Sequence, residues 1–240
     1  MWPMQYKDNK IQVEKQHIKC KEFNPEGNLR NAFVVMVHGW ASSDKKYLPL
    51  GERLSENGFN ALAVNLRGHN DSPYKLGDFS RQQHEEDIVT TLRYIRNRQP
   101  NNKIVLLGKS YSGYLSAIVA EREGVDFLIL SQPALYPDKQ YNTPTKIIID
   151  RDPNIFKQSD QEPKFNKAIK SFSQFRGNAL IIESENDEEI PKSTTGNYLK
   201  YATPKTTSIV LVGADHSLSR IEWREEFYRV VINWLVEVIK

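Results

Sequence analysis

Short apolar segments recur along the chain and alternate with longer segments whose apolar residues have helical spacing. Six of them follow a turn and are short enough to be strands, at residues 32–37, 59–66, 103–107, 126–131, 179–184 and 208–212. Runs without polar alternation are typical of parallel strands that are buried on both faces. Strands that alternate with helices predict an α/β fold, with a mostly parallel central sheet and helices on both faces.

The N-terminal part of the chain has a different pattern. Residues 11–13 and 17–23 alternate between apolar and polar side chains. This period of two predicts a half-exposed antiparallel hairpin at an edge of the sheet, with Cys20 on its apolar side.

Helices are predicted between the strands and at the end of the chain. Ser80 and Gln83 form a capping-box pattern that opens a helix reaching residue 98, with Ile88, Leu92 and Ile95 on one stripe. The other helices are expected at residues 47–57, 114–123, 190–202 and 220–240.

Length and composition predict one soluble domain over residues 1–240. The 33 basic and 30 acidic side chains give a net charge of +3, too small to indicate a nucleic-acid partner. Cys20 is the single cysteine, so an internal disulfide is excluded and a reducing compartment is compatible. We find no signal-peptide pattern and no apolar run of membrane-spanning length, so we expect a cytoplasmic protein without stable membrane insertion. The oligomeric state is open.

The elbow-like stretch at residues 103–113 carries the first chemical signal. An apolar run stops at Gly108-Lys109-Ser110, and small residues lead into a helical pattern. A serine at such a strand–turn–helix apex is typical of a nucleophile elbow, although an ordinary loop serine is the simpler alternative. A phosphate-binding loop is excluded, because that motif needs glycine where Lys103 stands.

Three reactive side chains each follow a different predicted parallel strand: Ser110, Asp187 and His216. They are therefore expected at the same edge of the sheet. The order serine, acid, histidine is that of the α/β-hydrolase fold. From Ala32 onward the chain resembles this superfamily, and most of all its group of small esterases, monoglyceride lipases and serine-aminopeptidase-like proteins. The motifs that carry the resemblance are His38-Gly39-Trp40, Arg67-Gly68-His69-Asn70-Asp71-Ser72, Gly108-Lys109-Ser110-Tyr111-Ser112-Gly113, Asn186-Asp187-Glu188-Glu189-Ile190-Pro191 and Gly213-Ala214-Asp215-His216-Ser217-Leu218.

The resemblance implies a role for each of these residues. Ser110 is the nucleophile, His216 the general base and Asp187 the acid that orients it. Glu185, Glu188, Glu189 and Asp215 are rival acids near Asp187 and His216. The backbone N–H groups of Trp40 and Tyr111 form the oxyanion hole, and neither a cofactor nor a metal is expected. Among the other histidines, His38 is expected to be structural, His69 to order its loop, and His17 and His84 to lie at the surface.

Two positions depart from the family pattern. Ser112 replaces the glycine that usually follows the nucleophile by two residues, and Asn70 replaces a loop glycine. A serine is small enough to leave the elbow plausible. Asparagine tolerates left-handed backbone, so the turn at Asn70 is expected to survive.

Residues 132–178 follow the strand at 126–131, which is the sixth when the two hairpin strands are counted. They are expected to form a short cap or lid insertion, because they are rich in proline, lysine and aromatics. The aromatics expected to cover an acyl slot are Tyr136, Tyr141, Phe156, Phe165, Phe172 and Phe175. The lysines at 139, 146, 157, 164, 167 and 170 either favour anionic leaving groups or, as we prefer, simply solvate the surface.

The sequence thus predicts a serine esterase that acts on a small-molecule ester of small or medium acyl length through an acyl-enzyme. Two alternatives stay open. The same triad could cleave peptides or acyl-thioesters, or the fold could serve as a non-catalytic binding protein.

Overall fold

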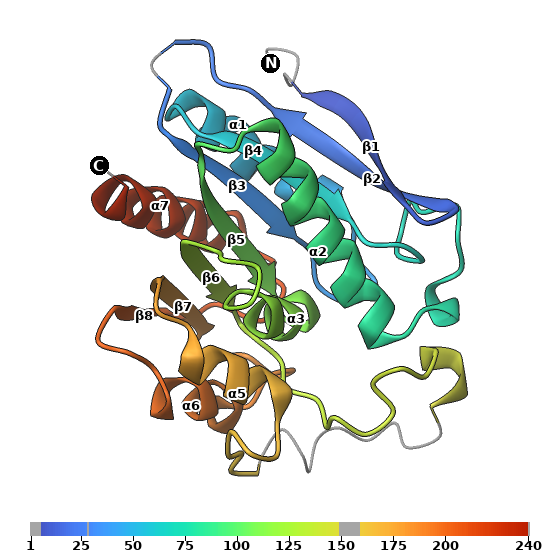
Figure 1. The fold of residues 1–240 in the computed structure, drawn as a ribbon. Helices are drawn as coiled ribbons and strands as arrows, with labels where there is room; N and C mark the ends of the chain where they lie inside the picture. The colour runs from blue at the N-terminus through green and yellow to red at the C-terminus, as the bar shows by residue number, and fades with distance from the viewer. Residues whose placement is uncertain (1–5, 28, 149–158, 240) are drawn as a thin grey trace.

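The computed structural model describes residues 6–27, 29–148 and 159–239. Within them one eight-stranded sheet runs through the molecule in the order β1-β2-β4-β3-β5-β6-β7-β8 (Figure 1). The strands are β1 (Lys7–Val13), β2 (Gln16–Phe23), β3 (Ala32–Val37), β4 (Asn60–Asn65), β5 (Lys103–Lys109), β6 (Phe127–Ser131), β7 (Asn178–Ser184) and β8 (Thr206–Leu211). From β4 to β8 all neighbours are parallel, whereas β1–β2 and β2–β4 are antiparallel. The predicted fold class and edge hairpin are confirmed.

Helices cover both faces of this sheet (Figure 1). One core contains side chains of α2 (Arg81–Arg98), α3 (Tyr111–Val119), α5 (Lys167–Gln174) and α6 (Lys192–Lys200). The core on the other face contains side chains of α1 (Leu48–Glu56) and α7 (Ile221–Val238). Three short 3-10 turns, η1 (Asp44–Tyr47), η2 (Leu76–Asp78) and η3 (Thr145–Ile147), lie in the connections. The carboxyl ends of β3 to β8 therefore share one edge, where the predicted reactive loops begin.

The predicted capping box of α2 is confirmed. The Ser80 hydroxyl accepts the backbone N–H of Gln83 at 3.3 Å, and the Gln83 side chain accepts the backbone N–H of Ser80 at 3.0 Å. The prediction that His84 lies at the surface is wrong, because its side chain is 0% exposed. His84 stands four residues before Ile88, so it belongs to the same buried stripe of the helix as Ile88 and Leu92.

Helix α3 ends earlier than the pattern predicts, at Val119 rather than near residue 123. The backbone N–H of Val125 closes the end by bonding to the carbonyl of Ala120 at 3.0 Å, and Gly124 adopts φ +61°. This is the bonding of a glycine-terminated helix, in which turn residues 120–124 lie between the last helical residue and Val125.

The insertion at residues 132–178 is partly a core element. Residues 149–158, and with them Phe156 and Lys157, lie outside the described residues. In α5, Ala168, Ile169 and Phe172 are buried, and the Phe172 ring lies 5.6 Å from that of Tyr198. The expectation that Phe172 and Phe175 cover an acyl slot is wrong, since the apolar face of α5 packs on the core.

Three of the described lysines of the insertion have nearby partners. Lys146 pairs with Asp78 at 2.6 Å and Lys164 with Glu162 at 3.0 Å. The ammonium of Lys167 lies 4.2 Å from the centre of the Tyr141 ring. These contacts favour a solvated surface over a site for anionic leaving groups. None of the described helices is both long and apolar enough to span a membrane.

Candidate active site

Ser110 stands at the junction of β5 and α3, in a backbone conformation that serine rarely adopts. Its φ is +51° and its ψ is −113°. Its N–H donates to the carbonyl of Ser131 at 2.9 Å, and its carbonyl accepts the N–H groups of Tyr114 and Ala134 at 3.1 and 3.0 Å. Positive φ is unfavourable for a residue with a Cβ and persists only where the surroundings hold it. This is the sharp strand-to-helix turn that the sequence predicts.

Small residues make this turn possible. A Cβ on Gly108 would lie 2.4 Å from the Ser116 hydroxyl and 2.5 Å from the Ser112 carbonyl oxygen. Ser112 is completely buried, and its hydroxyl donates to the carbonyl of Val37 at 2.6 Å and accepts the N–H of Lys109 at 2.9 Å. The side chain that replaces the usual glycine therefore fits, and it ties the end of β3 to the end of β5.

Replacing Ser112 with alanine is expected to lower the free energy of unfolding by about 1–3 kcal/mol, because the N–H of Lys109 and the carbonyl of Val37 lose a buried partner. Urea denaturation followed by circular dichroism measures the change. Ser173→Ala, on the outer side of α5, is the control and should change it by less than about 0.5 kcal/mol. Equal stability of the two variants would show that the Ser112 hydrogen bonds contribute nothing.

Asp187 and His216 meet across the loops that follow β7 and β8. His216 Nδ1 lies 2.8 Å from Asp187 Oδ2, and the two side chains are 11% and 6% exposed. Asp187 Oδ1 accepts the backbone N–H groups of Glu189 and Ile190 at 3.0 and 2.8 Å. An ionised carboxylate only accepts hydrogen bonds, so Nδ1 carries a proton, and in the neutral ring the lone pair is on Nε2.

The rival acids have other partners. Glu185 accepts the backbone N–H of Gly213 at 2.7 Å, and Asp215 accepts that of Ser219 at 2.9 Å, so both order the loop that carries His216. Glu189 lies on the other side of the imidazole, with Oε2 3.6 Å from Nε2. Of the five acids, Asp187 alone bonds to Nδ1 among the described residues.

Ser110 and His216 lie at the same edge of the sheet but are not joined by a hydrogen bond within the described part of the chain. His216 Nε2 instead faces the carboxylate of Glu189, whose side chain is 68% exposed. Contacts of this kind are often long in ligand-free proteins and tighten when substrate binds.

Lys109, directly before Ser110, is a charged neighbour that sequence reasoning passed over. Burial lowers the pKa of Lys109 to about 8, and Lys46 adds to this lowering. The carboxylates of Asp187, Asp215 and Glu189 act in the opposite direction on this pKa. Lys109 therefore adds positive charge on the side of the site where these acids gather.

The loop after β3 lies against the elbow. A Cβ on Gly39 would be 3.5 Å from the Cβ of Ser110 and 3.4 Å from the carbonyl oxygen of Lys109. The next residue, Trp40, is 40% exposed, and its ring stands edge-to-face on Tyr111 at 5.1 Å between ring centres. The two residues expected to supply oxyanion donors are thus in contact beside Ser110.

Loop histidines support these turns. The ring of His38 is 1% exposed, and its Nε2 lies 3.0 Å from the Asn65 side-chain oxygen, which confirms its structural role. His69 is 2% exposed, and its Nδ1 lies 3.3 Å from the carbonyl oxygen of Arg67. Burial lowers the pKa of His38 to about 4 and of His69 to about 2, so both are neutral at physiological pH.

The expectation for Asn70 is wrong in its mechanism. Left-handed backbone occurs at Gly68 (φ +80°) and Asp71 (φ +67°), on either side of Asn70. Asn70 instead uses its side chain, which donates to the carbonyl of Ala41 at 2.8 Å, while its carbonyl accepts the Asn65 side chain at 2.7 Å. The asparagine therefore links this loop to the one that carries Trp40.

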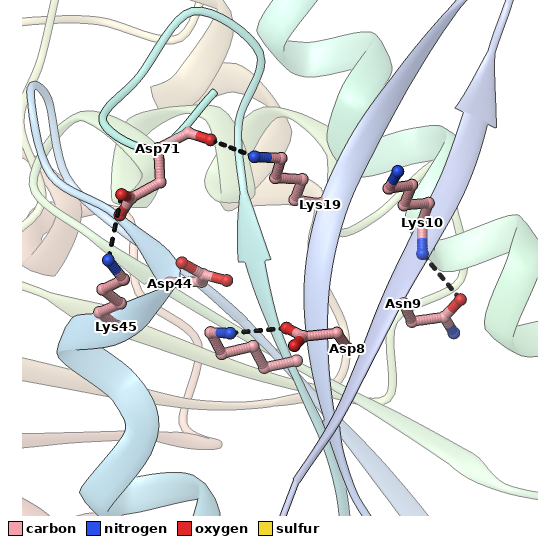
Figure 2. A pocket seen from close by; sticks show the side chains of 8 residues that line it. Asp8, Asn9, Lys10, Lys19, Asp44, Lys45 and Asp71 are labelled. Carbon is pink, nitrogen blue, oxygen red and sulfur yellow. Dashed lines mark hydrogen bonds and ion pairs between the residues drawn. The ribbon is translucent and has the colours of Figure 1, made fainter. Parts of the chain in front are cut away.

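A cavity of about 580 Å³ lies elsewhere, between the edge hairpin and η1 (Figure 2). Lys21 pairs with Asp8 at 2.6 Å, Lys45 with Asp71 at 3.1 Å, and Lys19 donates to the Asp71 carbonyl at 2.7 Å. None of the predicted site residues lines it. Within the described ranges no group of three or more His, Cys, Asp or Glu side chains is placed to hold a metal ion.

Comparison with known proteins supports this reading of the fold. A family model described as serine aminopeptidase, S33, matches residues 29–217. A curated relative from Escherichia coli, an uncharacterized 31.7 kDa protein of the traX-finO intergenic region, is 26% identical over 92 residues. That match covers 37% of this chain and 32% of the relative, so it spans about a third of the relative's length.

Solved structures match over nearly the whole chain. An α/β serine hydrolase homologue from Coxiella burnetii has a TM-score of 0.68 at 20% identity and covers 100% of both chains. A monoacylglycerol lipase from Paleococcus ferrophilus scores 0.70 at 22% identity, covering 92% of this chain and 98% of its own. Est1E from Butyrivibrio proteoclasticus, solved with ferulic acid, scores 0.76 at 16% identity, covering 95% and 98%. At these identities the structures show a shared fold.

Proposed function

Because the chain belongs to the serine aminopeptidase S33 family of α/β-hydrolases, we propose that it is a serine hydrolase that cleaves carboxylic esters of small or medium acyl length through an acyl-enzyme. The observation that carries the proposal is the placement of Ser110, at φ +51°, on the sheet edge where Asp187 and His216 are hydrogen-bonded at 2.8 Å. Serine needs a neighbouring base to act as a nucleophile at neutral pH, and His216 is the base available at this edge.

In the proposed reaction Ser110 Oγ attacks the ester carbonyl carbon while His216 Nε2 takes its proton. Asp187 holds the imidazole through Nδ1 and stabilises its charged form. The backbone N–H groups of Trp40 and Tyr111 bind the oxygen on which negative charge develops. His216 then returns the proton to the departing alcohol, and a water molecule releases the acyl group by the same route.

The preference for esters rests on the surroundings of Ser110. Trp40 stands beside the elbow with 40% of its surface exposed, which offers an apolar wall to an acyl group. The family description points to peptides, whereas the lipase and the esterase of similar fold point to esters. A panel of p-nitrophenyl esters from acetate to decanoate, an aminoacyl p-nitroanilide and an acyl-thioester separates these substrate classes. Esters of short or medium chain should be cleaved fastest.

Covalent labelling tests the nucleophile directly. A fluorophosphonate probe at neutral pH is expected to modify Ser110 in preference to the other serines, because Ser110 combines a half-buried elbow position with a histidine base on the same edge of the sheet. Peptide mapping by mass spectrometry identifies the labelled residue. Absence of labelling would support the non-catalytic binding protein and overturn the proposal.

A further inference from the structure

Four rings form a contiguous cluster beneath the candidate oxyanion hole, which we call the ring cluster: Trp40, His69, His84 and Tyr111. Trp40 meets His69 and Tyr111 edge-to-face, with ring centres 5.1 Å apart in both pairs. His84 meets His69 at 4.8 Å and Tyr111 at 5.6 Å. All but Trp40 are at most 2% exposed. The two residues whose backbone N–H groups are proposed to bind the oxyanion are therefore held by one set of rings.

Hydrogen bonds at the two ring nitrogens of His84 fix which groups of the ring cluster donate and which accept. His84 Nε2 lies 2.8 Å from the carbonyl oxygen of Arg67, and His84 Nδ1 lies 2.8 Å from the Tyr111 hydroxyl oxygen. A carbonyl only accepts, so Nε2 carries the proton and Nδ1 accepts the proton of the tyrosine. Burial lowers the pKa of His84 to about 3 and raises that of Tyr111 well above 10, so both groups keep these roles at physiological pH.

Arg67, which accepts the hydrogen bond from His84, is itself held by a buried carboxylate. The Arg67 backbone N–H and Nε bond to the two oxygens of Asp87 at 3.0 and 2.6 Å. Asp87 and His84 both lie on α2, three residues apart, and both are completely buried. The Tyr111 side chain is thus connected through His84 and Arg67 to the longest helix on that face of the sheet.

We propose that His84 is a positioning residue of the oxyanion hole, which sets the backbone N–H of Tyr111 by holding the tyrosine hydroxyl. Tyr111 is the first residue of α3, so its backbone N–H has no hydrogen-bond partner within the helix, and its direction depends on how the residue is held at its side chain and at Ser110. Oxyanion donors act only when they are aimed at the developing charge, and small misalignments lower the rate. This inference rests on the proposed function.

Paired substitutions at His84 separate positioning from packing. In His84→Asn the amide oxygen can take the place of Nδ1 and still accept from Tyr111, whereas in His84→Gln the amide nitrogen takes the place of Nε2 and the tyrosine loses its acceptor. Tyr111→Phe removes the hydroxyl and leaves the backbone N–H. We expect His84→Gln and Tyr111→Phe to lower kcat for p-nitrophenyl acetate about 10- to 50-fold with KM changed less than about twofold, and His84→Asn to stay within about threefold of the unmodified protein.

The double variant and an inhibitor complete the test. If both groups act through one hydrogen bond, His84→Gln has no further effect on kcat in the Tyr111→Phe background. Affinity for phenylboronic acid, which forms a tetrahedral adduct, should fall in parallel with kcat. Equal losses in His84→Asn and His84→Gln, or additive losses in the double variant, would overturn the inference. If the unmodified protein neither turns over esters nor reacts with the fluorophosphonate, the proposed function itself fails and the inference with it.

Discussion

Ser110→Ala is expected to lower kcat for p-nitrophenyl acetate by about 10⁴- to 10⁶-fold, because the covalent step disappears with the nucleophile. Binding of the substrate should change little, since alanine keeps the Cβ and removes one oxygen. Any residual rate would come from the oxyanion donors and from His216 acting on water. Steady-state kinetics with highly purified protein, free of host esterases, measures the effect.

A matched serine variant controls for unrelated losses. Ser55 lies in α1, on the opposite side of the sheet from α3, and Ser55→Ala should keep kcat within about twofold. Melting curves of both variants establish that they are folded. Ester hydrolysis at an unchanged rate in Ser110→Ala would refute the assignment of the nucleophile, whatever the other residues of the site do.

Acidification is expected to destabilise the folded chain strongly between pH 6.5 and 4. Buried His38, His69 and His84 have pKa values lowered to about 4, 2 and 3, whereas in the unfolded chain their pKa is near 6.5. Below pH 6.5 the unfolded chain binds protons that the folded chain cannot, so stability falls with pH. Each histidine contributes a loss of about 2 kcal/mol by pH 5.

Asp87 works against this loss. Burial raises the pKa of Asp87 to about 7, although the charge of Arg67 acts to lower it. The ordinary pKa of an aspartate is near 3.8, so this group stabilises the folded state increasingly as the pH falls from 7 toward 3.8. This offsets somewhat more than one histidine, and the net loss between pH 7.5 and 5 is about 3–4 kcal/mol. Urea denaturation at both pH values measures it.

A variant of His69 isolates the cause. His69 Nε2 is buried and has no hydrogen-bond partner among the residues that the structure describes, so His69→Phe removes one titrating ring and leaves the ring contacts largely in place. Its acid-induced loss should be smaller than that of the unmodified chain by about 2 kcal/mol, whatever its stability at neutral pH. A free energy of unfolding that is equal at pH 7.5 and 5 in both proteins would contradict the prediction.

Much of the fold could be predicted because local patterns and tertiary burial agree. Continuous apolar runs marked the central strands, and the Ser80–Gln83 box marked the start of α2. The sequence could place Ser110, Asp187 and His216 at one edge of the sheet because each follows a parallel strand. This placement depends on the topology of the sheet and not on side-chain contacts.

The errors have three separate causes. The surface position predicted for His84 is wrong because Tyr111 and Arg67, 27 and 17 positions away, satisfy both its nitrogens. The proline, lysine and aromatic content of residues 132–178 predicts a lid that includes Phe172, although the spacing of Ala168, Ile169 and Phe172 is that of an amphipathic helix. In the loop after β4 the non-glycine residue with left-handed backbone is Asp71, which no local rule distinguishes from Asn70.

The buried hydroxyl of Ser112 bears on how nucleophile elbows are recognised in other chains. A consensus sequence that requires glycine at this position does not match Ser112. In the structure the serine side chain fits there, and its hydroxyl connects the ends of β3 and β5. A description in terms of volume and bonding capacity would accept it: a residue no larger than serine, with a donor for the carbonyl that ends β3 and an acceptor for the N–H before the nucleophile. Chains dismissed for lacking that glycine are worth re-examining for a carbonyl within reach of the replacement.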